Sequence, residues 1–142
     1  MNFFLFFYHT VRFWIVIIIL SIILGTLATT LRIFDKSGNL SHKIAALWSK
    51  LICQLNGIKV EITGIENILS DRPQIFIANH QSYYDVFALS GYLGVQLRWV
   101  SKAVLFRIPF MGWAMSAAGY ISVERNNRRQ SYQAFLSTLE AI

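Results

Sequence analysis

The segment NHQSYYD contains a histidine and an aspartate five positions apart, His80 and Asp85. It continues from QIFIAN, a short apolar run that predicts a buried strand over residues 74–79. Open α/β sheets place their active sites at the ends of such strands. A neutral imidazole can act as a general base when a carboxylate accepts the proton on its other nitrogen. The segment therefore predicts a histidine–aspartate pair with acid–base chemistry.

The spacing of the pair restricts where each residue lies. Inside one helix, positions five apart point about 140° away from each other, so the two side chains would not meet. They meet when His80 lies in a loop and Ser82 caps a helix whose third residue is Asp85. The helix N-terminus would also keep that carboxylate ionised. Spacing alone leaves a second interpretation open, in which Asp85 only caps the helix and backbone groups satisfy His80.

The remaining segments predict the elements that position this pair. Alternating or apolar patterns favour strands over residues 58–64, 74–79, 97–102 and 120–125. Helical patterns cover residues 40–55, 82–93 and 109–119, the last opened by Pro109 and closed by Gly119, and another helix starts near Arg128. Strands separated by helices of this length favour an α/β fold with a mixed or parallel sheet flanked by helices.

The composition indicates a membrane protein or a lipid-facing surface. Apolar residues make up 55% of the chain and charged residues only 14%, where soluble proteins average about 25% charged residues. The net charge of +6 favours an anionic partner, and with this hydropathy a membrane surface or a phosphorylated lipid fits better than nucleic acid. Cys53 is the single cysteine, so no internal disulfide and no cysteine metal cage can form.

An N-terminal segment of 19 uncharged residues, 13–31, predicts a membrane helix. At 1.5 Å per residue it would extend roughly 28 Å, about the thickness of a bilayer core. We expect residues 1–39 to be a membrane anchor and residues 40–142 to form the domain that contains the histidine–aspartate pair. More basic residues follow the segment than precede it, which places the domain on the cytoplasmic side. A hairpin that dips into one leaflet remains an alternative to a helix that crosses.

Three stretches of the chain carry a resemblance to a known family. NHQSYYD matches N-H-x-x-x-x-D, the first sequence block of the glycerolipid acyltransferases typified by bacterial 1-acylglycerol-3-phosphate acyltransferase. GIKVEITGIENI is similar to the strand and turn that come before that block in the family. WVSKAVLFRIPFMGWAMSAAGYISVER is similar to the region of the family's second block. The resemblance covers residues 40–142, with Ser122 at a position where the family favours Phe.

The resemblance implies a function and a role for several residues. His80 would be the general base and Asp85 the residue that orients it, in acyl transfer from acyl-CoA or acyl carrier protein to lysophosphatidic acid. Arg125 and Lys102 would bind the lysolipid phosphate, although solvated cations at these positions are an alternative interpretation. Neither a metal nor a redox cofactor is implied. The expected location is the membrane, in a bacterium the inner membrane.

Two alternatives to this function stay open. The acceptor could be another lysolipid, or the chain could be a non-catalytic, membrane-associated fragment of the family. The family's third block, F-P-E-G-T-R-S, would follow the helix that starts near Arg128, and it is not present in the sequence. We therefore expect that the domain over residues 40–142 is a truncated, N-terminal part of an acyltransferase domain.

Overall fold

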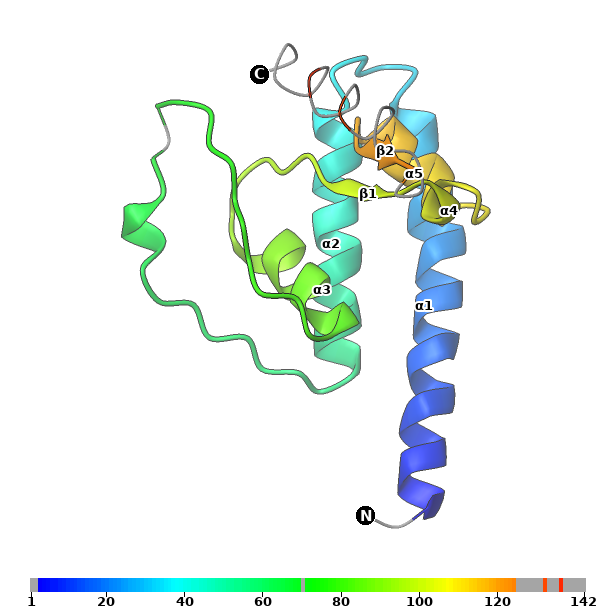
Figure 1. Cartoon of the computed structure of the whole chain (residues 1–142). Helices are drawn as coiled ribbons and strands as arrows, with labels where there is room; N and C mark the ends of the chain where they lie inside the picture. Colours follow the sequence, from blue (N-terminus) through cyan, green and yellow to red (C-terminus); the bar gives the residue numbers. More distant parts are fainter. Residues whose placement is uncertain (1–2, 70, 125–131, 133–135, 137–142) are drawn as a thin grey trace.

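The computed structural model describes residues 3–69 and 71–124, together with Tyr132 and Leu136. Two long helices, α1 (Phe3–Leu31) and α2 (Asn39–Leu55), lie side by side and run in opposite directions (Figure 1). The further elements in chain order are the 3₁₀ helix η1 (Ile65–Asn67), α3 (Tyr83–Tyr92), β1 (Val100–Lys102), α4 (Ala103–Phe106), α5 (Met111–Ala117) and β2 (Ile121–Val123).

Helix α1 contains the predicted membrane segment and begins earlier, at Phe3. Its 29 residues extend roughly 44 Å at 1.5 Å per residue. Four threonine hydroxyls donate to the carbonyl four residues earlier, so they need no water: Thr10, Thr26, Thr29 and Thr30. With a mean hydropathy of 2.5, α1 is the one helix in the described part of the chain that is long and apolar enough to cross a membrane.

The two faces of α1 have different surroundings. One face packs against a small hydrophobic core formed by Ile52, Cys53 and Phe87. The residues on that face are Phe13, Val16, Ile17 and Leu20. The opposite face exposes large apolar side chains along the helix, an arrangement we call the apolar stripe: Trp14, Ile15, Ile18, Ile19 and Ile22. The expected anchor and the expected domain thus share a core, and the boundary at residue 39 stays a prediction.

Helix α2 confirms the amphipathic helix predicted over residues 40–55. The loop before it turns at Gly38, whose φ of 77° is a conformation that glycine adopts without strain. The carboxylate of Asp35 accepts the backbone N–H of Leu40, 2.7 Å away, and interacts with Ser37. These hydrogen bonds, above all that from the Ser37 side chain, lower the pKa of Asp35 to about 2. An ionised Asp35 therefore caps the start of α2.

The strands predicted over residues 58–64 and 74–79 are wrong as strands in this structure. Both segments are extended but form no ladder with any described residue. The second segment is also not buried, since Ile77 is 94% exposed and Ile75 65%. A strand exists only through hydrogen bonds to a neighbouring strand, and an apolar pattern cannot supply that neighbour.

The strands predicted over residues 97–102 and 120–125 are confirmed in part: β1 is the second half of the first, and β2 lies within the second, whose residue 125 is outside the described residues. They pair in parallel, with Val100 opposite Ile121 and Lys102 opposite Val123. The crossover between them contains α4 and α5 (Figure 1). The described residues are thus mostly helical with a two-stranded parallel sheet, which is compatible with the predicted α/β class, and the larger sheet stays a prediction.

The predicted helix over residues 109–119 is present but shorter. Helix α5 begins at Met111, after Phe110 with a positive φ of 62°, so the helix does not open at Pro109. It ends before Gly119, whose φ of 72° confirms the predicted stop. Gly112 lets α5 fold back on α4, because a Cβ there would lie 2.2 Å from the carbonyl oxygen of Phe106.

Candidate active site

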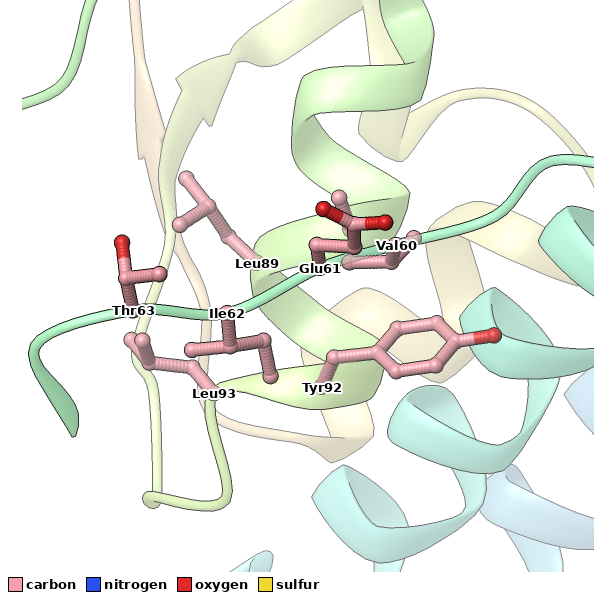
Figure 2. Close-up of a pocket in the computed structure, with 8 residues that line it drawn as sticks. Val60, Glu61, Ile62, Thr63, Leu89, Tyr92 and Leu93 are labelled. Carbon is pink, nitrogen blue, oxygen red and sulfur yellow. The ribbon is translucent and has the colours of Figure 1, made fainter.

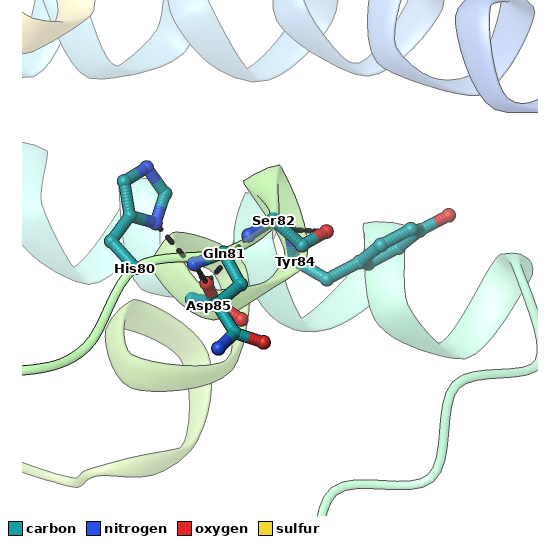
Figure 3. A network of polar contacts seen from close by, with 5 residues as sticks. All are labelled: His80, Gln81, Ser82, Tyr84 and Asp85. Atoms are coloured by element: carbon teal, nitrogen blue, oxygen red, sulfur yellow. Dashed lines mark hydrogen bonds and ion pairs between the residues drawn. The ribbon is translucent and has the colours of Figure 1, made fainter.

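His80 lies at the end of the extended segment that precedes α3. Ser82 is the N-cap of α3, and its hydroxyl oxygen accepts the backbone N–H of Tyr84 at 3.2 Å. Asp85, the third residue of the helix, reaches back to the cap, as the spacing predicted. Figure 3 shows the carboxylate beneath the loop, between the His80 ring and the first turn of α3. The helix cap brings the two predicted catalytic residues together.

One carboxylate oxygen of Asp85, Oδ2, makes three polar contacts. Oδ2 accepts the backbone N–H groups of Gln81 and Ser82, each at 2.7 Å, and lies 3.2 Å from Nδ1 of His80. The hydrogen bond from Ser82, followed by that from Gln81, lowers the pKa of Asp85. The carboxylate is therefore ionised at neutral pH, and helix capping and contact with the histidine occur together.

This arrangement fixes the proton on the imidazole. An ionised carboxylate can only accept hydrogen bonds, so Nδ1 of His80 carries the hydrogen that faces Asp85. The lone pair of a neutral ring is then on Nε2, which points away from Asp85 in Figure 3. The side chain of His80 is 58% exposed, and no hydrogen bond from another described residue reaches Nε2. The pair can accept a proton from a group that approaches from outside the fold.

The structure does not join Lys102 to this pair. Lys102 is the last residue of β1, exposed and directly before α4. Within the described ranges, no hydrogen bond or ion pair links it to His80 or Asp85. Figure 1 draws β1 and α3 at different heights along α2. Arg125, the other predicted phosphate ligand, lies outside the described residues.

A hollow of about 300 Å³ lies against the second half of α3 (Figure 2). Its wall combines the extended segment 60–63 with Ala88, Leu89, Tyr92 and Leu93 of α3. It is lined mainly by apolar side chains. Asp85 is in the first turn of α3, and the hollow begins after that turn. The hollow therefore does not enclose the histidine–aspartate pair.

His42 is a buried residue to which sequence reasoning assigned no role. The ring is only 3% exposed: Leu97 donates its backbone N–H to Nε2 at 3.3 Å, and Nδ1 lies 3.0 Å from the hydroxyl of Tyr120. Burial lowers the pKa of His42. The helical pattern contained the signal, because His42 is seven and ten residues before the buried Ser49 and Ile52, on the same face of α2.

Metal ligation has no candidate among the described residues, where no three of the His, Cys, Asp and Glu side chains form a cluster that could hold an ion.

Comparison with known proteins gives the context of this pair. The sequence pattern of the family described as Acyltransferase matches residues 59–141, more than half of the chain, and includes both His80 and Asp85. The chain belongs to the acyltransferase family. No solved structure matches it.

Curated relatives within this family share one name, 1-acyl-sn-glycerol-3-phosphate acyltransferase. The chloroplastic enzyme of Arabidopsis thaliana is 35% identical over 102 residues, which are 71% of this chain and 28% of that protein. The protein of Haemophilus influenzae is 33% identical over 127 residues, 85% of this chain and 50% of its own length. That of Escherichia coli is 33% identical over 81 residues, 57% of this chain and 33% of its own. The chain thus spans half or less of the length of these relatives.

Proposed function

We propose that the protein transfers an acyl group from an acyl thioester to the free hydroxyl of lysophosphatidic acid and so produces phosphatidic acid. The observation that carries this proposal is the contact between His80 and Asp85 at the start of α3. It leaves an exposed imidazole nitrogen free to act as a base, within the segment that matches the acyltransferase family. The shared name of the relatives supports lysophosphatidic acid as the acceptor.

The proposed reaction has two proton transfers at Nε2 of His80. The nitrogen takes the proton of the acceptor hydroxyl while its oxygen attacks the thioester carbonyl carbon, and a tetrahedral oxyanion forms. Asp85 holds the ring through Nδ1–H and stabilises the imidazolium. When the intermediate collapses, the carbon–sulfur bond breaks and Nε2 returns the proton to the leaving thiolate. The products are an ester and a free thiol, and the histidine is neutral again.

The acceptor phosphate needs cations, and we assign this role to Arg125 and Lys102. A guanidinium binds phosphate oxygens in pairs and an ammonium acts as a point charge. The exposed position of Lys102 at the end of β1 leaves its side chain accessible to a ligand. The proposed donor is acyl-CoA or acyl carrier protein, and no other cofactor enters the reaction.

Membrane attachment through α1 is part of the proposal. The apolar stripe is the face that would contact lipid, since the opposite face packs on the protein core. The basic residues Arg32, Lys36 and Lys43 follow the uncharged run, and this excess supports a cytoplasmic location for the catalytic residues. The site would then meet its lipid acceptor at the membrane surface.

The test is an assay of thiol release from acyl-CoA and from acyl carrier protein, with lysophosphatidic acid or another lysolipid as acceptor. It uses the protein in the full length that its gene encodes, in membranes. We expect release that depends on lysophosphatidic acid and on His80. Release that is the same without an acceptor, or with His80 replaced by alanine, would refute the proposal.

A further inference from the structure

A second hollow, of about 390 Å³, lies between the end of α1 and α5. It contains neither His80 nor Asp85. Its lining combines a guanidinium, two hydroxyls, an indole and a methyl group: Arg32, Thr29, Ser116, Trp113 and Ala117. A cation and an aromatic ring that share one open hollow, at the end of a long apolar helix, suggest a ligand with both charge and apolar surface.

The position of the hollow along α1 indicates its depth in a membrane. Arg32 is the first charged residue after the uncharged run 13–31, so the headgroup region would begin at this level. Helix α5 runs along the last turns of α1: a Cβ at Gly25 would lie 2.8 Å from the carbonyl oxygen of Phe110, just before α5, and Ala117 at the end of α5 accepts a hydrogen bond from Arg32. Trp113 is 51% exposed and packs on the Phe110 ring, with centroids 5.0 Å apart. Tryptophan favours this headgroup level of a bilayer.

The polar groups of the hollow are available to a ligand. Arg32 donates one N–H to the carbonyl of Ala117 at 3.3 Å, and no other hydrogen bond or ion pair from the described residues reaches its guanidinium. The nearest carboxylate in sequence, Asp35, interacts with Ser37 and Leu40 instead. The Thr29 hydroxyl donates within its own helix, as does that of Ser116, which leaves both oxygens free to accept.

Charge around the hollow favours an anionic ligand. The guanidinium of Arg98 lies close enough to Arg32 for their charges to interact, so two cations share this region, and the nearby Asp35 is bound to Ser37 and Leu40. The hollow also borders the apolar stripe, because Thr29 lies seven residues after Ile22 of the stripe and therefore on the same face of α1. A lipid that lies along the stripe would bring its phosphate to Arg32.

We propose that this hollow binds a membrane glycerophospholipid, with its phosphate on Arg32 and its glycerol ester region against Trp113. The lipid is not the substrate that His80 acts on, and its role is to hold α5 at the membrane surface. The inference rests on the proposed membrane attachment of α1. It goes beyond that attachment because it adds a contact made by α5.

Depth measurement with spin labels tests the location. Cys53 is fully buried, so an introduced cysteine is the position that takes the label. We would label Trp113→Cys, Ile19→Cys on the apolar stripe and Lys59→Cys on an exposed segment, in vesicles of phosphatidylcholine and phosphatidylglycerol. Exposure to oxygen, which dissolves in lipid, is compared with exposure to a water-soluble nickel chelate. We expect Ile19→Cys to be deep, Trp113→Cys at the headgroups and Lys59→Cys in water.

The outcomes separate this inference from the anchor. If the label at position 113 meets the nickel chelate as freely as the label at position 59, while position 19 is protected, α1 is in the membrane and the proposed hollow is not a lipid site. If position 19 is also freely accessible, the anchor and this inference both fail.

Lipid retention tests the role of Arg32. The protein is purified in detergent from membranes that contain phosphatidylglycerol, and bound lipid phosphorus per protein is measured. We expect Arg32→Gln to lose most of the retained phospholipid, Arg32→Lys to keep part of it, and Arg107→Gln to match the wild type. Arg107 is a suitable control because its guanidinium is 77% exposed and does not line the hollow. Equal retention in all four proteins, or removal of the lipid by inorganic phosphate alone, would overturn the proposal.

Discussion

Oδ2 of Asp85 accepts two backbone N–H groups of the α3 cap and lies 3.2 Å from Nδ1 of His80. The same oxygen atom therefore caps the start of α3 and orients the imidazole of His80. Because the cap exists only when α3 is folded, Asp85 orients the imidazole of His80 only in the folded state. The geometry makes separate predictions for the two residues, since one of them is mainly exposed and the other supports local structure.

Replacement of His80 by alanine should remove acyl transfer and leave the fold intact. Loss of a positioned general base reduces a rate by about 10²–10⁴. The melting temperature should stay near the wild-type value, because the side chain is 58% exposed and the Asp85 cap remains. The measurements are thiol release with lysophosphatidic acid and thermal unfolding in detergent.

His9→Ala is the matched control for this substitution. His9 is also exposed, and it lies on α1 without a carboxylate partner in the described structure. Its replacement should leave turnover at the wild-type level. Turnover of His80→Ala within a few fold of the wild type would exclude His80 as the base.

Replacement of Asp85 by asparagine should lower both turnover and stability at neutral pH. Asparagine has no negative charge to place beside the backbone N–H groups of the helix cap and the imidazole of His80. The pKa of Asp85 is lowered in the folded protein. The ionised carboxylate therefore stabilises the fold fully above the unfolded pKa of about 3.9, and this stabilisation is lost as the pH falls through the pKa of the folded state. The difference in melting temperature between wild type and variant should therefore shrink below about pH 4.

Asp71→Asn controls for a general loss of negative charge, since Asp71 is exposed and its ion pair in the described structure is with its neighbour Arg72. Its melting temperature should follow the wild type across the same pH range. A stability difference for Asp85→Asn that stays constant from pH 6 to pH 3 would contradict the proposed charged cap.

The contact between His80 and Asp85 could be predicted from the sequence because it is local. A capping box depends on residues three positions apart, and Ser82 with Asp85 meets that requirement whatever the rest of the chain does. The same holds for α2 and for the stop at Gly119, each fixed by neighbouring residues. Local chemistry therefore determined the candidate site.

The wrong and the missing expectations concern contacts between distant residues. The segment 74–79 has a strand pattern, but no strand of the described residues pairs with it. The burial of His42 depends on Tyr120 and Leu97, which are 78 and 55 residues away. A sequence pattern can show that a residue lies on a packed face, but it cannot name the partner across that face.

The two faces of α1 should respond differently to substitution. Leu20 packs on the core, so Leu20→Ala should lower the free energy of unfolding by about 2 kcal/mol, the lower end for this change because the side chain is half-buried. Ile19 is 50% exposed on the apolar stripe, so Ile19→Lys should leave the fold intact and weaken membrane retention. Thermal unfolding in detergent and carbonate extraction of membranes measure the two effects.

Removal of residues 1–39 gives a stronger form of this test. Since Phe13 and Leu20 cover the core beside Phe87, the remainder should aggregate instead of folding as a soluble domain. A monomeric, folded fragment 40–142 would show that α1 is a separate anchor. Equal membrane retention of Ile19→Lys and the wild type would show that the apolar stripe does not contact lipid.

The buried pair of His42 and Tyr120 predicts a stability that depends on pH near neutrality. Desolvation by burial lowers the pKa of His42, so the fold favours the neutral ring. The neutral ring accepts the Leu97 N–H at Nε2, and protonation of that nitrogen would end this hydrogen bond. Arg98 also lies close enough to lower the pKa of His42 further. The stability that the neutral His42 contributes is therefore fully present above its unfolded pKa of about 6.5 and is lost as the pH falls through its pKa in the folded state.

Thermal unfolding between pH 8 and pH 5 measures this dependence. The melting temperature of the wild type should fall as the solution is acidified. His42→Ala should be less stable at pH 8 by about 1–3 kcal/mol, because the buried Leu97 N–H and the Tyr120 hydroxyl lose their partner. Its melting temperature should then change less with pH, whereas His9→Ala should follow the wild-type curve. If His42→Ala retained the full wild-type slope, the titrating group would be another residue and the buried histidine would have no part in it.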